Sequence, residues 1–100
     1  MHTHKRAPDP DRLIAMEWRI MRDMKKMLRD TNLSVAERTR LASALGYHAT
    51  VLNKLLNQKG EAAHFNEATL GDFISDIDKS ARTLVRRDFE VWTRKLSLKK

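Results

Sequence analysis

Apolar residues recur at intervals of three and four along most of this chain, which is the period of an amphipathic α-helix. A first long helix is predicted over residues 10–30 and another over residues 67–96. The apolar arc of the first comprises Leu13, Ile14, Met16, Ile20, Met21, Met24, Met27 and Leu28. No segment alternates apolar and polar residues as a strand does, so the pattern predicts an all-α protein.

Local signals mark where the helices begin and end. Side chains that cap a helix favour its start, proline is tolerated in the first turn, and glycine often follows the last turn. The signals are Asp9 before Pro10, Ser34 with Glu37, Gly60, and Thr69 with Asp72. They predict helices over about 10–30, 35–45, 49–58 and 67–96, the last of them starting near Asn66 or Thr69.

The segment over residues 41–60, LASALGYHATVLNKLLNQKG, predicts two short helices joined by a sharp turn. Gly46 lies where the chain would leave the first helix, and glycine adopts a positive φ without steric cost. Ala42 would be small because the second helix crosses close to it. The residues expected to face inward are Leu45, Leu52 and Leu55.

Residues 41–57 of this segment resemble the helix-turn-helix of phage-repressor and Cro-type regulators. His48 and Ala49 depart from that pattern, which often has serine or asparagine after the turn. The resemblance implies a helix-turn-helix over about 35–58 whose second helix enters the DNA major groove. A helical hairpin with a glycine turn is the alternative.

The resemblance also implies which side chains would contact bases. Asparagine can pair with an adenine edge, lysine with guanine, and the threonine methyl group with thymine. The expected base contacts are His48, Thr50, Asn53, Lys54 and Asn57. The alternative is a solvated polar face that contacts nothing.

The charge of the chain favours a polyanionic partner, with 20 Lys and Arg against 13 Asp and Glu, a net charge of +7. Nucleic acid comes first and an acidic membrane second, and a basic protein without such a partner is the alternative.

One side of the first helix is basic, with almost no anions between the cations. The expected phosphate contacts are Arg12, Arg19, Arg22, Lys26, Arg29, Gln58 and Lys59. Trp18, beside this stripe, would stack on a base or pack against another helix.

Other classes of function find no support in the sequence. There are no cysteines, and the histidines lack the spacing of metal ligands. We expect no catalytic site, metal, cofactor or small-molecule ligand. No apolar run is long enough to span a membrane, and the first ten residues do not read as a signal peptide. We expect a cytoplasmic protein with a disordered basic tail over residues 1–8 and one helical domain over 9–100.

Three functions remain open. The first is a repressor-like transcriptional regulator that binds double-stranded DNA as a homodimer. The second is a phage-type DNA-packaging subunit or a nucleoid structural protein, and the third is a helical interaction module that does not bind DNA. Oligomerisation is expected because two short helices cannot cover a terminal helix of about 30 residues, which is about 45 Å long.

Overall fold

Helices account for all the regular secondary structure in the part of the chain that the computed structural model describes, residues 9–30, 32–60 and 66–96. In chain order they are α1 (Pro10–Leu28), α2 (Val35–Lys59), α3 (Glu67–Phe73) and α4 (Lys79–Lys95). The prediction of an all-α protein is therefore confirmed. The tail expected over residues 1–8 lies outside the described residues.

The capping signals at the first two helix starts and at Gly60 act as expected. The Asp9 carboxylate accepts the Asp11 N–H at the start of α1. At the start of α2, the Ser34 hydroxyl accepts the Glu37 N–H at 3.1 Å, and the Glu37 carboxylate accepts the Ser34 N–H at 3.0 Å. Gly60 follows α2 in the left-handed conformation, with φ 82°. These short-range contacts set the start of α1 and both ends of α2.

The predicted turn at Gly46 is wrong, because α2 runs without interruption from Val35 to Lys59. Gly46 is buried inside this helix where α4 crosses it. A Cβ at Gly46 would lie 2.7 Å from the Val85 carbonyl oxygen and 3.0 Å from the Phe89 nitrogen. The glycine therefore permits a close approach of two helix backbones rather than a change of chain direction.

The single helix predicted over residues 67–96 is also wrong, because the chain turns over residues 74–78 between α3 and α4. The cap of α3 is Asn66, whose side chain accepts the Thr69 N–H at 3.0 Å, in place of the expected Thr69–Asp72 pair. The turn folds the apolar residues on both sides of it onto the same core. No terminal helix of about 30 residues exists to require a partner.

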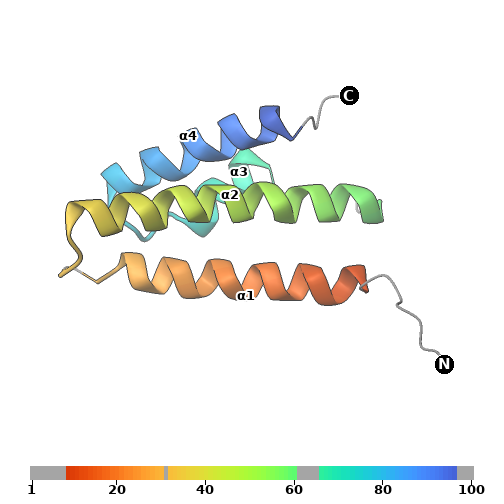
Figure 1. Ribbon diagram of the computed structural model, residues 1–100, viewed down its shortest axis with the longest axis horizontal. Coiled ribbons are helices and arrows are strands. Elements are labelled where there is room, and N and C mark those ends of the chain that lie inside the picture. Colours follow the sequence, from red (N-terminus) through yellow and green to blue (C-terminus); the bar gives the residue numbers. More distant parts are fainter. Residues whose placement is uncertain (1–8, 31, 61–65, 97–100) are drawn as a thin grey trace.

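The helices pack around α2, which contacts α1 on one side and α4 on the other (Figure 1). α1 runs antiparallel to α2, and the short α3 lies behind α2 in this view. The core takes residues from all four helices and from the turn before α4: Met21, Leu28, Ala42, Leu45, Ala49, Leu52, Leu70, Ile74, Ile77, Ala81, Val85 and Phe89. Among the described helices, none has the length and apolar character needed to cross a membrane.

Candidate nucleic-acid interface

The residues expected to read bases lie along α2 and do not form a separate exposed helix. Thr50 is fully buried, and its hydroxyl lies 3.1 Å from the Gly46 carbonyl oxygen and 3.2 Å from that of Phe89. Ala49 is buried as well. The expectation that Thr50 faces outward is therefore wrong, because this side of α2 is covered by α4.

His48 connects α2 to α1 instead of marking the end of a turn. Its Nδ1 lies 2.7 Å from the Glu17 carboxylate, and both side chains are mostly shielded from solvent. The Tyr47 ring meets the His48 ring edge-on and also the ring of Trp92 on α4. The imidazole thus contributes to helix packing in this conformation.

The remaining expected base contacts differ in exposure. Asn53 is half-buried, and its carboxamide oxygen has no hydrogen-bond partner among the described residues. It lines a hollow together with Thr93, whose buried hydroxyl also lacks a partner there. Lys54 is half-buried and Asn57 is exposed. Among the expected base contacts, only Asn57, near the C-terminal end of α2, is therefore exposed.

The basic side of α1 carries four exposed cations, which we call the α1 cation row: Arg12, Arg19, Arg22 and Lys26. None of them has a hydrogen bond or ion pair with another described side chain. Three arginines of the row surround Ala15 and Met16 in a shallow hollow of about 370 Å³. Because the arginines around this hollow are exposed, an external anion can approach them.

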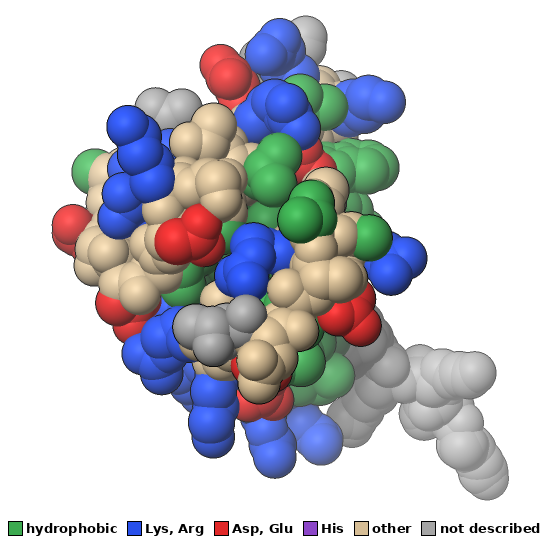
Figure 2. Space-filling model, turned by 90° about the vertical axis from the view of Figure 1, so that its left-hand side faces the viewer, with side chains coloured by type: hydrophobic (Ala, Val, Ile, Leu, Met, Phe, Trp, Pro, Cys, Tyr) green, Lys and Arg blue, Asp and Glu red, His purple; other side chains and the backbone are tan. Residues whose placement is uncertain are grey.

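The distribution of charge is uneven over the surface (Figure 2). Lys and Arg side chains gather along the lower edge, where α1 lies, and also at the upper edge, where α4 lies. On α4, Arg94 lies 3.8 Å from Glu90, Arg87 lies 4.0 Å from Asp88, and the Lys95 ammonium lies over the Trp92 ring. The basic residues of α4 are therefore partly compensated within their own helix, unlike the α1 cation row.

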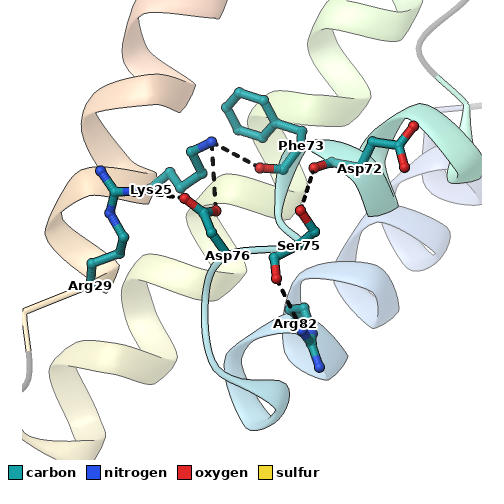
Figure 3. A network of polar contacts seen from close by, with 7 residues as sticks. All are labelled: Lys25, Arg29, Asp72, Phe73, Ser75, Asp76 and Arg82. Atoms are coloured by element: carbon teal, nitrogen blue, oxygen red, sulfur yellow. Dashed lines mark hydrogen bonds and ion pairs between the residues drawn. The ribbon is translucent and has the colours of Figure 1, made fainter.

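Arg29, the last member of the predicted stripe, is engaged within the molecule (Figure 3). Its guanidinium donates to Asp76 at 2.6 Å, in the turn between α3 and α4. Lys25 approaches the same carboxylate at 3.7 Å and donates to the Phe73 carbonyl oxygen at 3.0 Å. These contacts hold α1 against the turn. Arg29, which was expected to contact DNA phosphate, thus forms an ion pair within the molecule.

The two other expected phosphate contacts lie at the end of α2. Gln58 is exposed, whereas the Lys59 ammonium forms an ion pair with Asp11 at the start of α1. Trp18 packs against Phe73 with ring centroids 5.7 Å apart. Of its two expected roles, it therefore has the one in packing between helices.

Two carboxylates outside the α1 cation row are stabilised in their charged form. Hydrogen bonds from the Ser34 N–H, and secondarily from its hydroxyl, lower the pKa of Glu37. The Ser80 hydroxyl donates to Asp78 at 2.6 Å and lowers the pKa of that carboxyl. Both groups belong to helix starts, so their charges support the fold.

Two contributors to this surface were not predicted: Asp76, which links α1 to the turn, and Ala15, which lines the hollow between the arginines. Asp76 carries no local signal, because its partners are 47 and 51 residues away. Ala15 does carry one: it lies three residues after Arg12, four before Arg19 and seven before Arg22, which places all four on one side of a helix.

In comparisons with protein families, with curated proteins and with solved structures, nothing matches this chain.

Proposed function

We propose that this protein binds double-stranded DNA through the phosphate backbone, with the α1 cation row as the contact surface. The observation that carries the proposal is the row of four exposed cations without intramolecular partners. Like charges repel along a helix, so an unpaired row is unfavourable unless an anion neutralises it. A polyanion with regularly spaced phosphates supplies such neutralisation and releases its own counterions.

The geometry favours binding with little sequence preference. Phosphate contacts position a protein on DNA, whereas contacts with base edges specify the sequence. Thr50 and His48, two of the expected base contacts, are occupied by packing within the molecule. This supports a structural DNA-binding role, of the packaging or nucleoid type, over a reader of one operator.

A repressor-like regulator is the second candidate, supported by the polar end of α2. Lys54 reaches the surface, and Asn57 and Gln58 are exposed. These side chains have the chemistry that pairs with base edges. In this reading, the C-terminal end of α2 would add sequence preference to the phosphate contacts of α1.

The direct test is the affinity for a duplex of random sequence, measured by fluorescence anisotropy over a series of salt concentrations. Each phosphate contact contributes about 0.9 to the slope of log affinity against log salt. Replacing Arg22 and Lys26 with glutamine should therefore reduce the slope by about two. The matched control removes the same charge from α4, at Arg87 and Arg94, and should leave the slope nearly unchanged. Equal losses for both variants would show that only net charge matters, and no binding at low salt would favour the interaction module.

Selection of duplexes from a random pool separates the two DNA-binding candidates. A structural protein should enrich no motif, and alanine at Lys54 or Asn57 should change affinity equally for all sequences. A regulator should enrich one site, and each alanine should then cost about 1–3 kcal/mol on that site and far less on random DNA.

A further inference from the structure

One side of the α1–α2 pair presents apolar side chains that nothing in the described structure covers. Met16 is 54% exposed and Met27 is 47% exposed. Next to Met27 is an apolar hollow of about 550 Å³, with Glu37 and Arg40 at its edge. We call this side the open face: Met16, Ile20, Met27, Leu33, Leu41 and Ala44.

The open face lies opposite the side on which α3 packs. Trp18 and Lys25 of α1 contact Phe73 at the end of α3. Met27 is nine residues after Trp18, and Met16 is nine before Lys25, which at about 100° per residue places each methionine half a turn away. Within the described residues, the α1–α2 pair is therefore covered on one side only.

We propose that the open face binds the same face of a second copy of this chain, with the two α1 helices antiparallel. The evidence for this occupant is the charge along the edge of α1 beside Met16. Arg12 and Arg19 lie in the N-terminal half of α1, Asp23 lies in its C-terminal half, and these three fall within about 40° around the helix. Asp30 follows just beyond the end of α1, where its carboxylate accepts the Asn32 N–H.

An antiparallel copy brings opposite charges together along this edge. The pair Arg19 and Asp23 is centred on residue 21, and so is the pair Arg12 and Asp30. One two-fold axis that crosses the open face at the level of residue 21 therefore places Arg19 near the partner's Asp23 and Arg12 near the partner's Asp30. A parallel copy would place like charges together, which disfavours it.

The size of the open face is adequate for a dimer. α2 has 25 residues, which corresponds to about 37 Å, and two adjacent helices are about 20 Å wide. The pair thus offers on the order of 700 Å² per copy, near the roughly 800 Å² per partner of stable complexes. Exposed methionines suit such a contact because their side chains adapt to an irregular surface.

This inference does not depend on DNA binding. In the dimer Arg12 and Arg19 would pair with the partner's aspartates, which leaves Arg22 and Lys26 of each α1 cation row for DNA phosphate. Stacking α1 on the partner's α1 would bring two cation rows to the same flank of the dimer. Arg22 and Lys26, which test DNA binding, are not among the four edge charges. Failure of one proposal is therefore distinguishable from failure of the other.

The first experiment is sedimentation of the full chain without DNA at micromolar concentrations. The wild-type protein should be a dimer, and Met27→Glu should be a monomer with an unchanged helical circular dichroism spectrum. Val91→Glu is the matched control, because Val91 is a 37% exposed apolar residue on α4, and it should remain dimeric. A wild-type monomer, or a dimer that survives Met27→Glu, would overturn the proposal.

The second experiment tests the antiparallel register by charge reversal. Arg12 lies in the first turn of α1 and Asp30 lies just beyond its last residue, so the two side chains cannot meet within one copy. Arg12→Asp alone and Asp30→Arg alone should each raise the dimer dissociation constant about tenfold, since symmetry repeats every pair. The double variant should restore the wild-type value. If the double variant instead dimerised as weakly as the two single losses combined predict, this register would be excluded. This outcome does not depend on whether Met27→Glu folds.

Discussion

Gly46 of α2 lies against the backbone of Val85 in α4, so closely that a Cβ on the glycine would be 2.7 Å from the Val85 carbonyl oxygen. The atom that would be approached is backbone, and it cannot rotate away as a side chain can. The crossing of these two helices thus depends on the absence of one carbon atom.

We predict that Gly46→Ala destabilises the fold by about 1–3 kcal/mol or more, because it overpacks this crossing. The matched control is Gly71→Ala on α3, where the new Cβ would lie 3.0 Å from the mobile Arg86 guanidinium end. That control should be neutral or stabilising, since alanine favours a helix over glycine. Urea unfolding of the three proteins measures the difference, and equal stabilities would contradict the close crossing.

Thr50→Val should lower the free energy of unfolding by about 1 kcal/mol, because it removes the buried hydroxyl that bonds the Gly46 and Phe89 carbonyl oxygens. Thr83→Val is the control, since the Thr83 hydroxyl bonds only the exposed Lys79 carbonyl oxygen within α4. DNA affinity of the folded Thr50→Val variant should equal that of the wild type. A loss of affinity without a loss of stability would return Thr50 to the role of a base contact.

Asp76→Asn should weaken the attachment of the α3–α4 turn to α1, because Asp76 pairs with both Lys25 and Arg29. These side chains are partly exposed, so we expect a loss of below about 1 kcal/mol that shrinks at high salt. Asp72→Asn makes the same change of charge four residues earlier, where the carboxylate points away from the network in Figure 3. It should be neutral, and equal effects of the two variants would argue against the network.

Stability should fall at acidic pH through Glu37 and Asp78. Hydrogen bonds lower the pKa of both carboxyls in the folded state, below the unfolded values of about 4.5 and 3.8. Their contribution is therefore complete above the unfolded pKa and is lost as the pH falls through the folded pKa. Glu37→Gln retains a capping side chain but does not titrate. Urea unfolding between neutral pH and about pH 3 should show a smaller decline for this variant than for the wild type.

The starts of α1 and α2, and the end of α2, could be predicted because each is decided by bonds between residues that are close in sequence. Ser34 and Glu37 are three residues apart, and Gly60 needs only its own freedom to adopt a positive φ. The exposure of the α1 cation row was predictable for the same reason. Helical periodicity separates Arg19 and Arg22 from Met21 whatever the rest of the chain does.

Only the tertiary structure decided the role of Gly46 and the break before α4. Glycine permits both a turn and a close helix crossing, and the choice depends on Val85, which is 39 residues away. Apolar spacing is helical across residues 74–78, yet the chain turns there, and Asp76 of that turn pairs with Lys25 and Arg29 of α1. Local sequence thus determined the starts of α1 and α2, the end of α2 and the basic side of α1. Contacts between distant residues determined which polar side chains reach the surface, because burial depends on the neighbouring helix.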